Sequence, residues 1–207
     1  MTFGLWPRFE VALEKFAPMV LKALAPPATR EQIAEAETAV SAEFPPEVVT
    51  AYLRHNGCID NDNCYDRHIL TFANWIGLGR VVRDWSMDRF GEARLRRISD
   101  DNLCFPTYDS SWDELLVRPV AADPKWIPIG GTNAKGGELI DLNPGPAGRR
   151  GQLIHHDGDG GMHWVAEGLD HYLERLTVLL ERKTIYYDER WRVTATKKNA
   201  YNFAELL

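Results

Sequence analysis

Residues 126–166, WIPIGGTNAKGGELIDLNPGPAGRRGQLIHHDGDGGMHWVA, decide the fold of this chain. The stretch holds four short apolar runs, at 126–129, 138–142, 152–155 and 162–166, and clusters of Gly, Pro and Asp separate them. Short apolar runs bounded by such turn residues are typical of β-strands that pair antiparallel with their neighbours. The stretch therefore predicts a four-stranded antiparallel meander.

A helix is expected directly after the meander. Residues 169–180 carry apolar side chains at helical spacing, which predicts an amphipathic helix that packs on one face of the sheet. Apolar residues at the same spacing precede the meander in the first half of the chain. Helices, then an antiparallel sheet, then a helix predict the α+β class, with N-terminal helices, a central antiparallel meander sheet and a C-terminal covering helix.

Local signals set the bounds of the N-terminal helices. Pro18 lacks a backbone donor and should split or kink the first helical run. Thr29 and Gln32 have the spacing of a capping box, which predicts the start of the next helix. Proline is tolerated in a first helical turn, so Pro46 can open the following helix, and Gly57 can end it in the left-handed C-cap conformation.

The remaining segments complete a one-domain interpretation. We expect a short strand at 69–72 and a helix at 75–90. The predicted organisation is a helical N-terminal extension at 1–27, the main domain at 28–183 and a C-terminal tail at 184–207.

Composition limits the possible partners and the compartment. The chain has 207 residues and a net charge of −6, from 24 Lys and Arg against 30 Asp and Glu. Binding to nucleic acid or anionic membranes relies on clustered Lys and Arg, so neither is expected as a direct partner. The three cysteines give no disulfide framework, the N-terminus lacks a signal peptide, and no apolar run approaches the roughly 20 residues that span a bilayer. We therefore expect a cytoplasmic protein.

The segments that could form a metal site, a calcium loop or a phosphate loop lack the spacing or the residues that such a site needs. His155 and His156 alternate faces on a strand, so only one of them can meet His163 across a hairpin, and no three-histidine metal site forms. The glycines and aspartates at 157–161 lack the further ligands of a calcium loop, and the glycine-rich residues at 130–137 lack the ending of a phosphate loop. We expect no catalytic residue, no metal and no cofactor.

Several short segments occur in an order that is similar to that of one protein family. They are residues 29–40, 44–47, 52–57, 126–130, 138–144, 148–154 and 165–173. In this set the chain resembles the SMI1/KNR4 family, which belongs to the SUKH superfamily. Phe44 stands where the family usually has Leu, and residues 93–123 follow no family pattern.

The resemblance implies a non-catalytic α+β domain that binds proteins. Bacterial members are similar to immunity proteins that neutralise a cognate toxin delivered by neighbouring cells, and an acidic member could dock on a nuclease toxin with a basic cleft. Fungal relatives look like regulatory scaffolds tied to cell-wall synthesis or signalling, so a scaffold without a toxin partner is the alternative. A hydrolase is a third class, and the oligomeric state stays open.

Two acidic segments are the candidate partner-binding surfaces. The first is a loop with Asp60, Asp62 and Asp66, and the second contains Asp109, Trp112, Asp113 and Glu114. Carboxylates fit a basic partner, and an exposed Trp beside acids is a plausible anchor of an interface. The structural alternative is that the acidic residues lie in a solvated loop and that Trp112 is an ordinary core tryptophan.

The family-motif positions are predicted to be structural. They are Pro46, Asn56, Gly57, Trp126, Pro128, Asp141, Gly151 and Gln152. At Asp141 we expect an Asx-type role, in which the carboxylate accepts backbone hydrogen bonds from the following turn. A ligand contact at Asp141 is the functional alternative.

Overall fold

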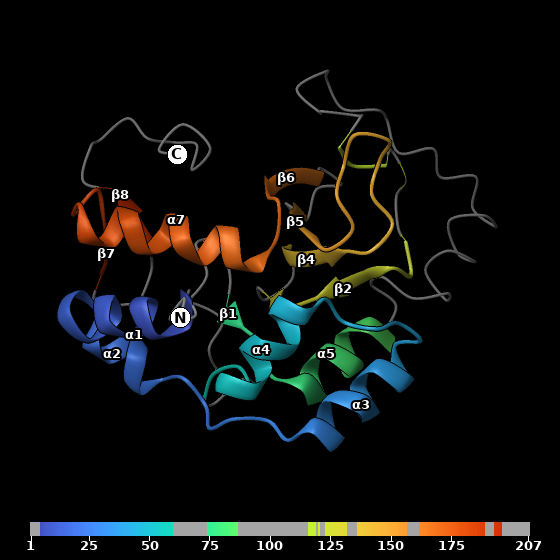
Figure 1. Cartoon of the computed structure of the whole chain (residues 1–207), viewed down its shortest axis with the longest axis horizontal. Coiled ribbons are helices and arrows are strands. Elements are labelled where there is room, and N and C mark those ends of the chain that lie inside the picture. The colour runs from blue at the N-terminus through green and yellow to red at the C-terminus, as the bar shows by residue number, and fades with distance from the viewer. Residues whose placement is uncertain are drawn as a thin grey trace.

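The computed structural model describes residues 5–59, 74–86, 116–118, 120, 123–131, 136–156, 162–188 and 193–195 (Figure 1). The described helices are α1 (Leu5–Phe16), α2 (Pro18–Lys22), α3 (Arg30–Ala39), α4 (Pro46–Arg54), α5 (Leu78–Asp84) and α7 (Leu169–Glu181). The described strands are β1 (Asn74–Trp75), β2 (Trp126–Pro128), β3 (Gly130–Gly131), β4 (Gly137–Asp141), β5 (Gln152–His156), β6 (Met162–Ala166), β7 (Ile185–Tyr187) and β8 (Val193–Ala195). These elements confirm the predicted α+β class.

The central sheet is the predicted meander. Its strand order is β2-β4-β5-β6, and every neighbouring pair is antiparallel. Its register places Asp141 of β4 between Trp126 of β2 and Gln152 of β5. A bulge interrupts the pairing of β5 with β6 between Leu153 and Ile154. This register lines up the ends of three strands, where the candidate site lies.

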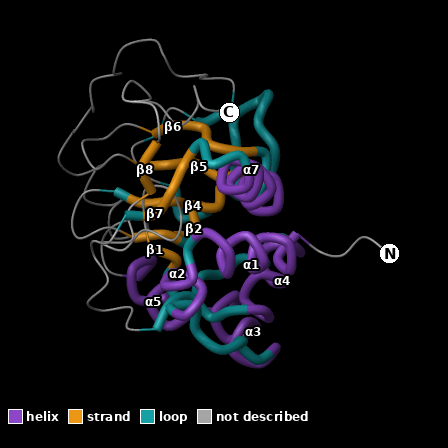
Figure 2. Tube along the Cα trace, turned by 90° about the vertical axis from the view of Figure 1, so that its left-hand side faces the viewer, coloured by secondary structure: helices purple, strands orange, loops and turns teal. Residues whose placement is uncertain are grey.

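The two faces of the sheet bury different clusters because side chains alternate along each strand. Ile127, Ile140 and Leu153 lie opposite one another on neighbouring strands and join the large core that the helices form. Trp126 and Ile154 belong to a smaller cluster, which Val117 and neighbouring residues cover. Figure 2 shows α7 and α1 gathered beside the strands on the helical side. The predicted covering of one face by the C-terminal helix is therefore confirmed.

The local signals for the first helices are confirmed. α1 ends at Phe16 and α2 begins at Pro18, so the proline splits the run. Thr29 and Gln32 form both hydrogen bonds of a capping box, at 2.9 and 3.2 Å. α4 begins at Pro46.

Two expectations about the following segment are wrong. The helix predicted at 75–90 begins only at Leu78, because Trp75 pairs in β1 with Gly130 of β3. Gly57 does have a positive φ of 77°, but α4 has already ended, since His55 is extended. Because glycine has no Cβ, Gly57 can instead lie against the backbone of Gly77. The strand predicted at 69–72 lies outside the described residues.

The N-terminal helices are packed into the main core. α1 lies along α7, where Arg8 donates two hydrogen bonds to Glu181 at 2.6 and 3.1 Å (Figure 1). Glu10 accepts hydrogen bonds from Arg54, which is the main reason that the pKa of Glu10 is lowered, and His55 Nε2 lies 2.8 Å from the same carboxylate. The core cluster extends along the chain from Trp6 to Tyr187. The boundaries at 27 and 183 stay a prediction.

The C-terminal segment contains a small hairpin, β7 paired with β8, whose Ile185 and Tyr187 are buried. Within the described residues, no helix is both long enough and apolar enough to cross a bilayer.

Removing buried volume from either face of the sheet should destabilise the protein. Leu173 of α7 and Trp126 of β2 are both fully buried. Leu173→Ala should lower the free energy of unfolding by about 2–5 kcal/mol and Trp126→Ala by about 3–5 kcal/mol, from lost burial and the remaining cavity. Urea denaturation measures both, and Val11→Ala, at a side chain that is 64% exposed, is the control with an effect below about 0.5 kcal/mol. Wild-type stability in either core variant would contradict the core described here.

Two glycines should respond oppositely to one added methyl group. A Cβ at Gly57 would collide with the backbone of Gly77 and would also sit on a left-handed residue, so Gly57→Ala should cost several kcal/mol, on the order of 2–4. Gly79, in the first turn of α5, has open space around its Cβ position. Gly79→Ala should leave stability unchanged or raise it by up to about 1 kcal/mol. Equal thermal melting shifts for the two variants would contradict the close approach at Gly57.

Candidate protein-binding site

The two acidic candidate surfaces lie outside the described residues. This applies to Asp60, Asp62, Asp66, Asp109, Trp112, Asp113 and Glu114. They stay predictions. The family-motif positions are all described, and several of them converge on one corner of the sheet.

Asp141 is the centre of that corner. It is the last residue of β4 and is fully buried. The backbone N–H of Asn143 donates to its Oδ1 at 2.9 Å, which is the Asx-type hydrogen bond that the sequence predicts. The side-chain amide of Gln152 donates to Oδ2, also at 2.9 Å. A buried carboxylate needs such donors, because an unpaired one costs far more free energy than the bonds themselves provide.

The same hydrogen-bond network also holds residues 116–118, which precede the sheet in the sequence. Gln152 Nε2 also donates to the carbonyl of Leu116, at 2.7 Å. Arg118 Nη1 donates to the buried carboxylate of Asp123 at 3.0 Å, and Asn143 Nδ2 donates to the same carboxylate at 2.7 Å. The hydrogen bonds of Asn143 therefore join the two carboxylates, and those of Gln152 join β5 to residues 116–118.

Burial is the main reason that the pKa of Asp141 lies above its ordinary value. Loss of hydration raises its pKa above the ordinary value of 3.8, and the nearby charge of Asp123 acts in the same direction. The hydrogen bonds from Asn143 and Gln152 act in the opposite direction without cancelling the effect of burial. The buried position of this carboxylate and its hydrogen bonds from Asn143 and Gln152 fit the structural role that the sequence predicts.

Two glycines of this corner pack closely against residues at the start of α4. A Cβ at Gly151, which has a φ of 92°, would approach the ring of Pro45 to 3.0 Å. A Cβ at Gly168, the N-cap of α7, would approach Glu47 Oε1 to 3.1 Å. The carboxylate of Glu47 thus lies beside the N-terminus of α7, and Glu47 itself belongs to the first turn of α4. The dipoles of both helices favour a negative charge at this position. Burial raises the pKa of Asp170, and the negative charge of Glu47 raises it further.

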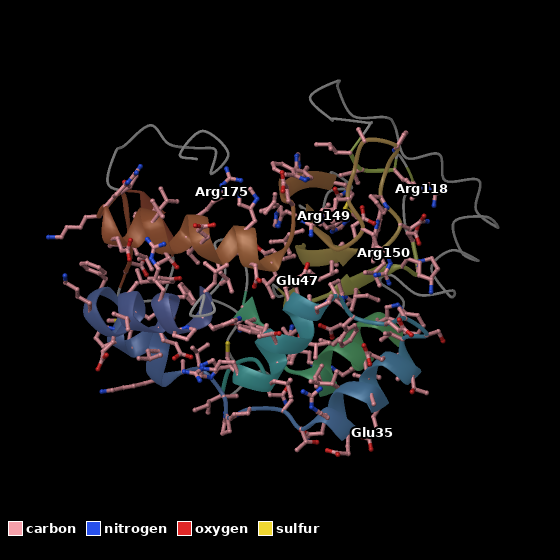
Figure 3. All side chains as sticks on the ribbon, in the orientation of Figure 1. Glu35, Glu47, Arg118, Arg149, Arg150 and Arg175 are labelled. Atoms are coloured by element: carbon pink, nitrogen blue, oxygen red, sulfur yellow. The ribbon has the colours of Figure 1, made fainter. Side chains whose placement is uncertain are left out.

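Two adjacent arginines project from the connection between β4 and β5 (Figure 3). Arg149 has a side chain that is 66% exposed, and its nearest carboxylate in an ion pair is Glu167, at 3.9 Å. Arg150 is also exposed, and its Nη2 donates to the backbone carbonyl of Glu43 at 3.2 Å. Both guanidinium groups therefore lie at the surface without a hydrogen-bonded carboxylate among the described residues.

A third arginine, in α7, contacts the backbone near the end of β6. Arg175 of α7 is partly buried, and its Nη1 donates to the carbonyl of Val165 at 3.3 Å. Burial lowers the pKa of Arg175, and no described carboxylate forms an ion pair with it. Val165 lies two residues before Glu167, whose side chain is the ion-pair partner of Arg149.

The histidines are arranged as the strand alternation predicts. His155 lies opposite His163 across β5 and β6, whereas His156 lies opposite Met162. His155 Nδ1 is 4.0 Å from Glu138 Oε1. Among the described residues, no three histidine, cysteine or acidic side chains are grouped so that they could hold a metal ion.

The arginines and Glu47 carry no sequence signal that separates them from other surface charges. The nearest signal is position, since Arg149 and Arg150 stand between Gly148 and Gly151 in a connection rich in turn residues. Only the fold brings Arg175 and Glu47 to the same corner, from two helices that are far apart in the sequence.

The comparison with known families agrees with the resemblance in the sequence. The sequence model of the SMI1/KNR4 family (SUKH-1) matches residues 27–175. None of the curated proteins compared with the chain matches it. The matched residues contain α3, α4, the four-stranded sheet and the first half of α7, whereas α1, α2, β7 and β8 lie outside the match.

Asp141 should make the protein less stable as pH rises from the acid range. A carboxyl group whose pKa is higher in the folded state binds a proton more readily there, so folding is favoured at low pH. This contribution falls as the pH rises from about 3.8 through the higher folded pKa, and it is constant above that. Asp141→Asn removes the titration, so the stability of the wild type relative to this variant should decrease over that pH range. Urea denaturation at a series of pH values measures the difference, and an increase with pH would contradict the assignment.

Proposed function

The chain belongs to the SMI1/KNR4 family (SUKH-1), and from this we propose that it is a non-catalytic protein-binding domain, an immunity protein that neutralises a cognate toxin by direct binding. The observation that carries the proposal is the family match over residues 27–175. Membership of this family supports a protein-binding role of the immunity or SMI1 type.

Charge suggests how such a toxin would be recognised. A net charge of −6 suits a partner with a basic surface, such as a nuclease with a cationic cleft. Long-range attraction would speed the encounter, and the bound protein would cover the cleft. In this proposal the loop with Asp60, Asp62 and Asp66, or the segment around Trp112, contacts the toxin.

The buried network suits a binding protein because it keeps the surface above it in one conformation. Asp141 and Gln152 are fully buried and hydrogen-bonded within the protein, so neither carries a free group suited to acid–base chemistry. The family is generally non-catalytic, which supports the proposal that this chain is not an enzyme. We propose the cytoplasm as its compartment, where a toxin that enters the cell would be met.

A regulatory scaffold of the SMI1 type is the alternative within the same family. The two functions differ in one observable property, which is the presence of a toxin partner. A neighbouring gene that encodes a long secreted protein with a C-terminal toxin domain favours the immunity function.

Co-expression with that neighbouring gene tests the proposal. The immunity function requires that the chain restore growth to cells producing the toxin domain and that the two proteins purify as a stable complex. Growth arrest that persists with well-folded chain present, together with no complex, would reject it in favour of the scaffold.

Charge reversal then tests the acidic loop. Changing Asp60, Asp62 and Asp66 to Lys should slow association and weaken its dependence on salt without changing the melting temperature. The matched control changes three exposed acids elsewhere to Lys: Glu14, Glu35 and Glu174. Trp112→Ala should instead speed dissociation, since a buried aromatic anchor acts mainly on the lifetime of a complex. Wild-type kinetics in both the loop variant and Trp112→Ala would move the interface elsewhere.

A further inference from the structure

The corner between the β4–β5 connection and the end of β6 contains three arginines without a hydrogen-bonded carboxylate among the described residues. They are Arg149, Arg150 and Arg175, which Figure 3 labels. Among the described residues, Arg150 and Arg175 donate to backbone carbonyls, those of Glu43 and Val165. For Arg149 the nearest ion-pair atom, Glu167 Oε2, lies at 3.9 Å, beyond hydrogen-bond distance.

Four of the other described arginines hydrogen-bond to a carboxylate. Arg8 and Arg54 each bind a carboxylate through two nitrogens, at 2.5 to 3.1 Å. Arg80 and Arg118 each bind one aspartate oxygen, at 3.1 and 3.0 Å. Although acids outnumber bases in the chain, this corner leaves guanidinium donors available.

The backbone that carries Arg149 is held at both of its hydrogen-bonding groups. Its N–H donates to Gln152 Oε1 at 3.1 Å, and its carbonyl accepts from the N–H of Gln152 at 3.0 Å. Gln152 is itself fixed by Asp141 and Leu116. The base of the arginine pair is therefore already ordered before any partner arrives, which reduces the entropy lost on binding.

Arg175 adds a second, independent feature. Its guanidinium is partly withdrawn from water, yet its hydrogen-bond acceptor within the described part of the chain is a carbonyl at a long distance of 3.3 Å. A partly desolvated guanidinium binds a carboxylate more strongly than a fully hydrated one does, because water screens the pair less.

We propose that Arg149, Arg150 and Arg175 form a docking surface for a carboxylate-rich segment of a protein partner. The proposal rests on the proposed function, in that the chain binds a protein, but it adds a surface whose charge is opposite to that of the acidic loop. Guanidinium groups match carboxylates in bidentate geometry, and arginine is enriched among the residues that dominate interfaces.

Neighbouring acids argue for spaced carboxylates over a nucleic acid. Glu47, Glu167 and Asp170 lie within the same corner and would repel a continuous phosphate backbone. A peptide can place its carboxylates against the arginines and its uncharged residues against these acids.

Fluorescence anisotropy with a labelled peptide of alternating glutamate and glycine tests the proposal directly at low salt. Wild-type protein should bind it, and Arg149→Glu with Arg150→Glu should weaken binding by roughly tenfold or more. The matched control, Arg30→Glu with Arg182→Glu, changes the net charge equally at two exposed arginines outside the corner and should stay within about threefold of wild type.

Further variants separate geometry from charge. Lysine at 149 and 150 keeps the charge but loses the planar fork, so it should recover part of the affinity only. Arg175→Gln should weaken binding of the peptide while thermal melts show a folded protein. Melts of every variant establish that any loss of binding is not unfolding.

Three results would overturn the proposal. They are absence of peptide binding, equal loss in the Arg30 and Arg182 control, and equal or tighter binding of a uridine oligonucleotide of the same charge that depends on the same arginines. Because the assay uses no toxin, failure of the co-expression test with peptide binding intact rejects the immunity function alone. Rescue of growth without peptide binding rejects this surface alone.

Discussion

The hydrogen bonds at Asp141 are the constraint on which the corner of this protein depends. A carboxylate without water is tolerated only when donors surround it, and here they come from the turn that follows β4 and from the first residue of β5. Because Gln152 also binds the Leu116 carbonyl, one side chain determines how three distant segments meet. The position of each segment follows from satisfying polar groups that cannot reach solvent.

Apolar burial supplies the free energy, and the polar network selects the arrangement. The sheet is buried on both faces, by the helical core on one side and by the cluster around Trp126 on the other. Burial alone is not directional and would accept several positions for residues 116–118. The hydrogen bonds from Gln152 and Asn143 are directional and therefore select among these positions. A defined arrangement is consistent with the protein-binding role that the family supports.

Helices outside the family match take part in the same core. α1 packs on α7, and its Trp6 contacts the ring of Trp75 with their centroids 4.7 Å apart. Glu10 links α1 to the end of α4 through Arg54 and His55. These contacts place α1 beside α7 (Figure 1).

The sequence by itself determined the elements whose signals are local. Turn residues at fixed positions defined the four strands, alternation assigned their faces, and Thr29 with Gln32 defined a helix start, because each of these depends on neighbours within a few residues. The pairing of Trp75 with Gly130 and the role of Gly57 were decided only by tertiary structure, since both depend on backbone from distant parts of the chain. The same reason applies to the corner with Arg149, Arg150 and Arg175. Its arginines are ordinary charges in the sequence, and only the tertiary structure shows that none of the three has a hydrogen-bonded carboxylate among the described residues.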